Sequence, residues 1–176
     1  MKKAVFLDRD GVINRKAPEG QYVTRWEDME FLAGSRDAVR LFNDAGFLVI
    51  VVSNQRCVAK GLITTTDLES LHERMRREFQ AADARIDAVY YCPHDNEPPC
   101  GCRKPQAGML FDAARAHDVK LGASWMIGDS THDIEAGRSA GCHTAQIVVN
   151  GHQAHNGVEL LAASLLDAAH KILQIG

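Results

Sequence analysis

The sequence predicts an α/β fold: a doubly wound, Rossmann-like parallel sheet with helices on both faces. Apolar runs rich in β-branched residues alternate with helical patterns along all 176 residues. These runs are continuously apolar, as expected for strands that are covered on both sides. With 45% hydrophobic and 24% charged residues, the composition is that of an ordinary globular protein, so we expect residues 1–176 to form a single domain.

Five segments have the composition of buried strands. Each is short and apolar, and each is followed by a helical pattern. The expected strands cover 4–8, 47–54, 87–92, 124–129 and 144–149. Parallel sheets of this kind bind ligands beyond the carboxyl ends of their strands, so the residues that follow these segments are the candidates for a site.

Five helical patterns lie between and after these strands. The expected helices cover 34–46, 64–82, 107–117, 131–141 and 158–173. Within the second pattern, Thr66 and Glu69 have the spacing of a capping box. The intervals between these elements leave no room for a separate lid domain. We therefore expect a capless fold whose ligand is selected by loops 12–32, 54–61 and 92–104.

Charge and targeting signals restrict the partners of the chain. The net charge of −3 provides no general attraction to nucleic acid or to an anionic membrane. The apolar run near the N-terminus is interrupted at Asp8, which is too early for a signal peptide, and no later run approaches membrane-spanning length. We expect a cytoplasmic monomer with no nucleic-acid or membrane partner.

The stretch "CPHDNEPPCGCRKP", residues 92–105, has the composition of a metal-binding loop. Its C-x-H and C-x-C pairs offer three thiolates and one imidazole, a donor set that suits tetrahedral Zn²⁺. Four protein ligands leave no open position for water, which predicts a structural ion. The predicted ligands are Cys92, His94, Cys100 and Cys102; the alternatives are a disulfide or incidental cysteines.

Polar side chains follow four of the predicted strands. Asp8 and Asp10 are two residues apart, so they leave an extended backbone on the same side, where paired carboxylates favour a divalent cation. The alternative is a solvated loop entry. Ser53, Lys104 and Asp129 follow three later strands. Asp133, one helical turn beyond Asp129, is interpreted as a helix-start residue or a group behind the ligands.

The motifs "DRDGVIN", "SNQ", "CRKP" and "GDSTHDIEAG" resemble the four motifs of the haloacid dehalogenase superfamily of phosphatases. The resemblance implies that Asp8 is a nucleophile that forms an aspartyl-phosphate and that Asp10 is the general acid and base. Ser53 and Lys104 would hold the phosphoryl oxygens. Mg²⁺ would be bound by the carboxylates of Asp8 and Asp129 and by the backbone carbonyl of Asp10.

The capless, zinc-bearing pattern is similar to one branch of that superfamily, which contains heptose-bisphosphate phosphatases and histidinol-phosphatases. "YYCPH", "CGCRKPQAGM" and "SNQ" with "AKGL" carry the likeness, and region 58–75 favours the heptose enzymes. The resemblance implies removal of the 7-phosphate of D-glycero-D-manno-heptose 1,7-bisphosphate, in nucleotide-heptose and lipopolysaccharide core synthesis. Histidinol phosphate is the alternative substrate.

The substrate would be a small phosphorylated sugar. Candidates for contacts to the sugar or to a distal phosphate are Glu19, Gly20, Gln21, Tyr22, Asn54, Gln55, Arg56 and Arg103. Arg56 and Cys57 replace a small pair that is usual in the branch, which changes the expected shape of that loop. Our hypothesis for the metal loop is that zinc fixes it so that Arg103 and Lys104 point into the active site.

A phosphorylated receiver domain is the alternative from another class. Receiver domains share the doubly wound fold, the aspartates, Mg²⁺ and a lysine. Their phosphorylated aspartate, however, follows a later strand, whereas the D-x-D pair of this chain follows the first.

Overall fold

The computed structural model describes residues 1–148 and 154–175. One six-stranded sheet, in which every strand pairing is parallel, runs through the molecule in the order β3-β2-β1-β4-β5-β6. The strands are β1 Ala4–Leu7, β2 Leu48–Asn54, β3 Ala88–Cys92, β4 Trp125–Gly128, β5 His143–Ile147 and β6 Leu160–Ala162. The predicted α/β fold with a parallel sheet is confirmed.

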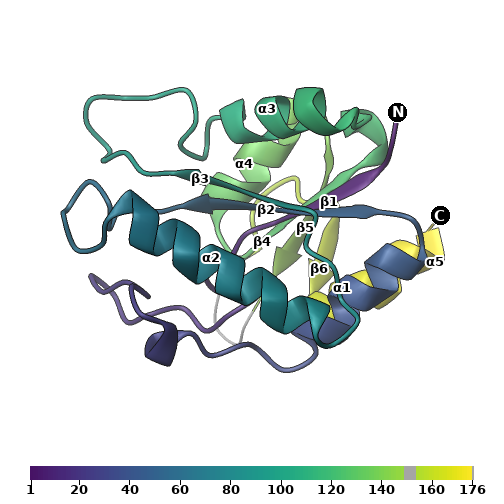
Figure 1. Cartoon of the computed structure of the whole chain (residues 1–176). Helices are drawn as coiled ribbons and strands as arrows, with labels where there is room; N and C mark the ends of the chain where they lie inside the picture. Colours follow the sequence, from purple (N-terminus) through teal and green to yellow (C-terminus); the bar gives the residue numbers. More distant parts are fainter. Residues whose placement is uncertain (149–153, 176) are drawn as a thin grey trace.

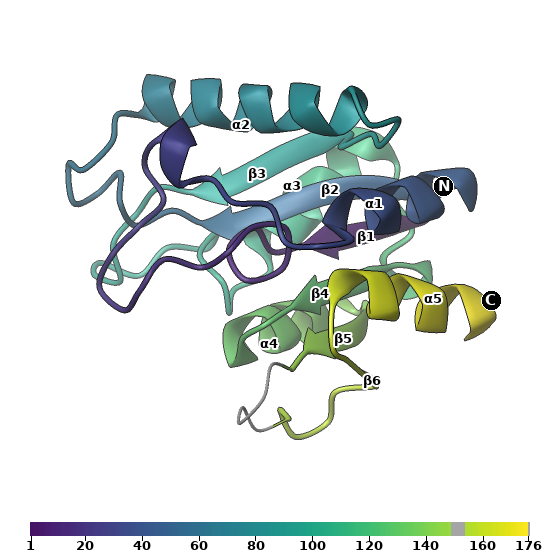
Figure 2. The same ribbon diagram turned by 90° about the horizontal axis from the view of Figure 1, so that it is seen from below.

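Helices cover both faces of the sheet, as Figures 1 and 2 show. They are α1 Ser35–Asp44, α2 Thr65–Gln80, α3 Gly108–His117, α4 Thr131–Ala140 and α5 Leu165–Ile175, with short 3₁₀ turns at Trp26–Asp28 and Leu121–Ala123. Val5 and Leu7 pack with α1, α2 and α5, whereas Ala4 and Phe6 pack with α3 and α4. Successive residues of one strand thus serve two cores, which explains its uninterrupted apolar sequence.

The strand order creates the position of the site. After β3 the chain returns to the other side of β1 and continues outward through β4 and β5. Strands β1 and β4 are therefore neighbours, with Val5 opposite Trp125, although their sequences are far apart. A reversal of strand order of this kind leaves a crevice at the carboxyl ends of the two strands.

The loops that follow β1, β2 and β3 all extend from this edge, at the left of Figure 1, while the two termini lie at the opposite side. Between β1 and α1 the chain forms an irregular excursion with one 3₁₀ turn, and no further sheet lies in the intervals of residues 1–148. The capless arrangement is confirmed for this described part of the chain.

The C-terminal prediction was wrong in one respect. Residues 158–173 were predicted as one helix, but β6 occupies Leu160–Ala162 and α5 begins only at Leu165. Ser164 caps α5 by accepting a hydrogen bond from the Asp167 N–H at 3.1 Å. The two leucines of β6 fit a helical period equally well, and only pairing with β5 makes this segment a strand.

Smaller differences concern element ends. The N-cap of α2 is Thr64, whose hydroxyl accepts the Asp67 N–H at 3.0 Å, rather than the predicted Thr66–Glu69 pair. Val149, the last residue of the fifth predicted strand, lies outside the described residues. None of the helices in the described ranges has the length and hydropathy of a membrane span.

Candidate active site

Asp8 and Asp10 stand at the carboxyl end of β1, beside the end of β4. The Asp8 N–H still donates to the Ile127 carbonyl at 3.0 Å, so the first aspartate is anchored to the neighbouring strand. Gly11 follows with a φ of +94°, and a Cβ at this position would lie 2.2 Å from the Asp129 Oδ2. Glycine is thus required here for the backbone conformation and for the close approach of Asp129.

Lys104 lies between two carboxylates. Its buried ammonium is 2.8 Å from the Asp8 Oδ1 and 2.6 Å from the Asp133 Oδ1, and it donates to the Val52 carbonyl at 2.7 Å. Burial opposes the charge of the ammonium, but the charges of Asp133 and Asp8 outweigh burial and raise the Lys104 pKa. With three partners for three N–H groups, the direction of this cation is fixed.

Carboxylate oxygens of Asp8, Asp129 and Asp133 lie within 4.8 Å of one another; we call this group the carboxylate cluster. Burial raises the Asp8 pKa to about 7, the charges of Asp133 and Asp129 act in the same direction, and Lys104 opposes them. The Asp129 Oδ1 is buried and has no hydrogen-bond partner among the described residues. Clustered acidic oxygens with an unpaired lone pair match the ligand preference of a hard divalent cation.

Asp133 connects this cluster to α4. Its carboxylate accepts hydrogen bonds from the Ser130 N–H at 3.0 Å and the Ser130 hydroxyl at 2.6 Å, which caps the helix. The Lys104 ammonium and these bonds overcome the effect of burial and lower the Asp133 pKa. The predicted placement at the helix start is confirmed, and the partner of Asp133 is Lys104.

The Asp10 carboxylate is turned to other partners. It accepts from the Arg9 guanidinium at 3.0 Å and from the Asn14 amide at 2.9 Å, and the Gln55 amide donates to it at 3.2 Å. Burial alone would raise the Asp10 pKa, but the Arg9 charge and these bonds lower it. The sequence-based prediction for metal binding concerned the backbone carbonyl of Asp10, and this carboxylate is not a member of the carboxylate cluster.

The last residues of β2 and the residue directly after it fix the positions of their neighbours. The Gln55 amide donates to the Ser53 hydroxyl at 2.6 Å and so links this buried serine to Asp10. The Asn54 side chain forms two hydrogen bonds of 3.0 Å with the backbone N–H and C=O of Lys104. β2 therefore holds both the Asp10 carboxylate and the chain segment that carries the lysine.

A cavity of about 360 Å³ opens over these groups. Asp8, Asp10, Ser53 and Lys104 line it. So do most of the predicted sugar-contact residues, namely Glu19, Gly20, Gln21, Tyr22, Asn54, Gln55 and Arg103. The excursion after β1 therefore forms one wall of the cavity and the loops after β2 and β3 form the other.

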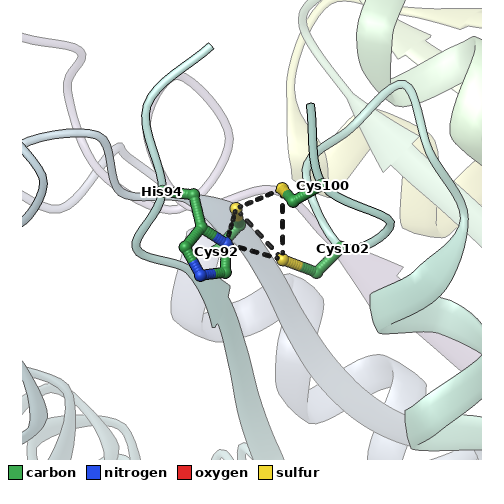
Figure 3. Close-up of side chains that lie close together, drawn as sticks. All are labelled: Cys92, His94, Cys100 and Cys102. Atoms are coloured by element: carbon green, nitrogen blue, oxygen red, sulfur yellow. Dashed lines mark hydrogen bonds between the residues drawn. The ribbon is translucent and has the colours of Figure 1, made fainter. Parts of the chain in front are cut away.

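Figure 3 shows the second group of ligand-type side chains, which we call the thiolate cluster: Cys92, His94, Cys100 and Cys102. The three sulfurs are 3.2 to 3.6 Å apart, and the His94 Nδ1 is 3.3 Å from the Cys102 Sγ and 3.5 Å from the Cys92 Sγ. A tetrahedral ion with metal–sulfur bonds of ~2.3 Å would separate its sulfurs by about 3.8 Å. All five cysteines are free, so the disulfide alternative is excluded.

Ionisation of these thiols is uneven. Burial and the hydrogen bonds of its two cysteine neighbours raise the Cys102 pKa to about 12. Burial acts in the same direction on Cys100, but hydrogen bonds from the Arg103 backbone and from the neighbouring side chains lower its pKa to about 6. Three thiolates at this separation repel one another, and a bound cation would remove that repulsion.

Comparisons with known proteins agree with this geometry. A family model described as HAD-hydrolase-like matches residues 101–166. The D-glycero-beta-D-manno-heptose-1,7-bisphosphate 7-phosphatase of Escherichia coli K12 is 35% identical over 96% of this chain and 93% of its own length. This chain belongs to the heptose-1,7-bisphosphate 7-phosphatase family.

Two further members of the heptose-1,7-bisphosphate 7-phosphatase family extend the match. The Campylobacter jejuni enzyme, named for the alpha anomer, is 40% identical over 83% of this chain and 82% of its own. The crystal structure of the Bordetella bronchiseptica D,D-heptose 1,7-bisphosphate phosphatase, complexed with magnesium and phosphate, superposes with a TM-score of 0.89. It is 32% identical and the match covers 99% of both chains.

Two features of this member of the heptose-1,7-bisphosphate 7-phosphatase family were not foreseen. Lys16, in the excursion after β1, reaches across the site and its ammonium is 3.0 Å from the Asp129 Oδ2. Arg9, between the two aspartates in sequence, is only 1% exposed, and its guanidinium contacts the Asp10 carboxylate. No spacing of residues in the sequence indicates either contact. A lysine in a polar loop, such as Lys16, is expected to be a solvated surface residue.

Arg56 lies outside the residues that line the cavity. Its guanidinium pairs with Asp95, at 2.5 Å from Nε to Oδ1, and so joins the loop after β2 to the metal loop. Arg103 lines the cavity, and its guanidinium donates to the His94 carbonyl at 3.3 Å. In this heptose-bisphosphatase family member, two arginines thus tie the thiolate cluster to the walls of the cavity.

Proposed function

We propose that this protein is a Mg²⁺-dependent phosphomonoesterase that removes the 7-phosphate of D-glycero-D-manno-heptose 1,7-bisphosphate. The observation that carries the proposal is the convergence of Asp8, Lys104 and Asp129 beside one cavity, in a chain of this family. The product, heptose 1-phosphate, would be available for nucleotide activation in lipopolysaccharide core synthesis. The protein would act as a single-domain monomer.

Asp8 is the proposed nucleophile. Its carboxylate would attack phosphorus, form an aspartyl-phosphate and release the sugar alkoxide, which divides one difficult step into two. Repulsion between a carboxylate and a phosphate at ~4 Å is about 4 kcal/mol per pair of charges at an effective dielectric near 20. Lys104, 2.8 Å from the Asp8 Oδ1, lies where its charge opposes that repulsion.

The carboxylate cluster is the proposed metal site. Held by Asp8, Asp129 and the Asp10 backbone carbonyl, Mg²⁺ would supply the positive charge that lets an anionic nucleophile approach an anionic phosphate. The buried Asp129 Oδ1, which has no hydrogen-bond partner in the described part of the chain, supports this assignment. Lys104 and the Ser53 hydroxyl would hold the phosphoryl oxygens, with Asp133 keeping the lysine in place.

Asp10 is the proposed acid and base. Starting from its protonated form, it would give its proton to the leaving alkoxide and then recover one from the water that hydrolyses the aspartyl-phosphate. The Arg9 charge, which lowers the Asp10 pKa, would favour the release of that proton. The Asp10 side chain is 24% exposed and lines the cavity, so substrate and water can both reach it. The remaining walls would contact the sugar and its second phosphate through Glu19, Gly20, Gln21, Tyr22, Asn54, Gln55 and Arg103. Arg56, which does not line the cavity, stays a candidate from the sequence alone.

The thiolate cluster is the proposed site of a structural Zn²⁺. Its four ligands would close the coordination shell and fix the loop that carries Arg103 and Lys104. The short separation between Cys102 and Lys104 in sequence, and the contact of Arg103 with the His94 carbonyl, support this role.

The deciding experiment compares kcat/KM on both anomers of heptose 1,7-bisphosphate, on fructose 1,6-bisphosphate and on histidinol phosphate. We expect one heptose anomer to be the best substrate, and the comparison identifies which. A clear preference for histidinol phosphate would refute the substrate assignment and leave the chemistry intact. The absence of phosphate release from all four compounds, with Mg²⁺ present, would refute the chemistry as well.

A further inference from the structure

Arg9 is a buried cationic residue that stands between the two proposed catalytic aspartates in sequence and contacts the second of them, Asp10. It is among the largest fully buried side chains of the protein. Two nitrogens of its guanidinium donate to the Asp10 carboxylate. The Arg9 Nη2 is 3.0 Å from the Asp10 Oδ2 and 3.1 Å from Oδ1, and the Arg9 Nε is 3.3 Å from Oδ1. A planar donor group bound in this way restricts the rotation of the carboxylate as well as its position.

The other side of the guanidinium is held by α2. The Arg9 Nη1 is 3.0 Å from the His72 Nε2, and the Arg9 Nη2 donates to the Val23 carbonyl at 3.4 Å. Arginine has no acceptor, so Nε2 must accept this bond and the imidazole must be neutral. Burial, followed by the Arg9 charge, lowers the His72 pKa to about 3, which agrees with that assignment.

This chain of contacts ends at the cavity. His72 is 4% exposed and 63 residues away from Arg9 in sequence, so the interaction joins the middle of α2 to the end of β1. On Asp10, the Arg9 bonds combine with those of Asn14 and Gln55, which leaves the carboxylate one orientation. Burying a guanidinium opposite a histidine costs desolvation that an apolar pair at this position would avoid.

We propose that His72 and Arg9 are positioning residues, which aim the Asp10 carboxylate at the leaving oxygen and at the attacking water. This inference rests on the proposed function, because it assigns Asp10 the two proton transfers. Neither residue touches the substrate in this scheme; both act through Asp10. A misplacement of about 1 Å in such a group reduces the rate by up to about a hundredfold.

The test uses two leaving groups. Nitrophenolate leaves without protonation, whereas a sugar alkoxide requires the acid. In His72→Leu we expect kcat on the heptose bisphosphate to fall about ten- to a hundredfold. With enzyme in excess over p-nitrophenyl phosphate, the first release of nitrophenolate should stay within about twofold of the unmodified protein, because that step needs Asp8 but no proton from Asp10.

Three further proteins complete the experiment. His72→Gln keeps an acceptor for Arg9 and should restore most of the heptose turnover. His117→Leu is the matched control on the other face of the sheet, where His117 has the Tyr90 hydroxyl, at 3.2 Å, as its hydrogen-bond partner within the described residues; neither rate should change. Arg9→Lys keeps the charge but cannot donate to the Asp10 carboxylate through two nitrogens. As in His72→Leu, turnover of the heptose bisphosphate should fall while the first release of nitrophenolate stays nearly unchanged.

The positioning role is refuted if both rates fall by the same factor in His72→Leu and Arg9→Lys, or if neither rate changes. A heptose turnover that His72→Gln fails to restore also refutes it. Failure of the proposed function is distinguishable, since in that case the unmodified protein releases no phosphate from the heptose and Asp8→Asn leaves nitrophenolate release unchanged.

Discussion

The two clusters of ligand-type side chains lie at the same edge of the sheet but are assembled in opposite ways. The thiolate cluster takes all four of its residues from an eleven-residue stretch that ends β3 and forms the next loop. The carboxylate cluster joins Asp8, after the first strand, to Asp129 and Asp133, after the fourth. The first is local in sequence, whereas the second exists only because β1 and β4 are neighbours in the sheet.

Burial differs in the same sense. Lys104, 3% exposed, and Asp133, 1% exposed, anchor the carboxylate cluster inside the protein. In the thiolate cluster Cys92 is buried and Cys100 and Cys102 are half-buried, as Asp8 and Asp129 are, but His94 and residues 96–99 of the connecting loop are exposed. The protein interior therefore preorganises the carboxylates. The thiolate cluster packs on the core through its cysteines, but the exposed loop between them would depend on a bound metal for its conformation. We expect changes in the first cluster to affect chemistry and changes in the second to affect stability.

The largest effect is expected for Asp8→Asn. An amide of the same shape cannot act as the nucleophile, so kcat should fall by at least about 10³-fold. Phosphate release measures the loss, and circular dichroism with a thermal melt checks that the fold persists. Substantial turnover in this variant would exclude the covalent mechanism.

Cys102→Ser should act mainly on stability. Loss of one ligand should lower the zinc content and reduce the free energy of unfolding by at least about 2 kcal/mol, a decrease in Tm of about 4 °C or more. Turnover should also fall, because the loop positions Lys104. Cys57→Ser, outside the cluster, is the control for zinc content. Normal turnover in a zinc-free protein would show that the metal does not fix the catalytic loop.

The pH dependence of the free energy of unfolding tests whether the buried His72 imidazole, behind Arg9 and Asp10, is neutral. The His72 pKa is lowered from 6.5 to about 3, so the folded protein binds this proton less readily than the unfolded chain. The neutral imidazole therefore makes its full contribution to the free energy of unfolding above pH 6.5, and this contribution is lost as the pH falls toward 3. Between about pH 7.5 and about pH 5 the unmodified protein should lose about 2 kcal/mol more than His72→Gln does in urea unfolding. Equal losses in the two proteins would contradict a neutral buried imidazole.

Asn54→Ala should have a smaller effect, confined to catalysis. Removing its two bonds to the Lys104 backbone should reduce kcat about tenfold, with KM nearly unchanged. Asn43 offers a matched control, because its side chain makes the same pair of bonds to the Arg85 backbone, at 3.1 and 2.7 Å, far from the site. Asn43→Ala should destabilise the protein similarly and leave kcat intact. A rise in KM without a change in kcat in Asn54→Ala would instead indicate direct contact with the substrate.

The smallest effect is expected for Arg56→Ala. Its pair with Asp95 is about one-third exposed on each side, and solvated pairs of this kind contribute little to stability. Unfolding of the Arg56 and Asp95 single and double alanine variants measures that coupling. A large loss of kcat/KM in Arg56→Ala with unchanged stability would establish the predicted substrate contact.

Prediction from sequence succeeded where a local sequence pattern is compatible with a single structure. The helix faces, the five strands β1 to β5 and the proximity of the four residues of the thiolate cluster were recognisable because each depends on residues that are close in the chain. β6 was missed because its leucines also fit a helix. Lys16, Arg9 and His72 were missed because their partners come from other elements. The two hydrogen bonds of the Asn54 amide to the Lys104 backbone were missed for the same reason, and its contact with the substrate stays a prediction.

The sequence by itself determined the chemical types at the strand ends: acidic pairs after β1 and β4, a hydroxyl after β2, a lysine after the metal loop. Local periodicity and ligand spacing are properties of short segments, so they can be read from the chain. Only the tertiary structure decided which of these groups meet, through the return of the chain to the other side of β1. Long-range contacts such as Arg9 with His72 follow from packing two cores onto one sheet, which no local pattern encodes.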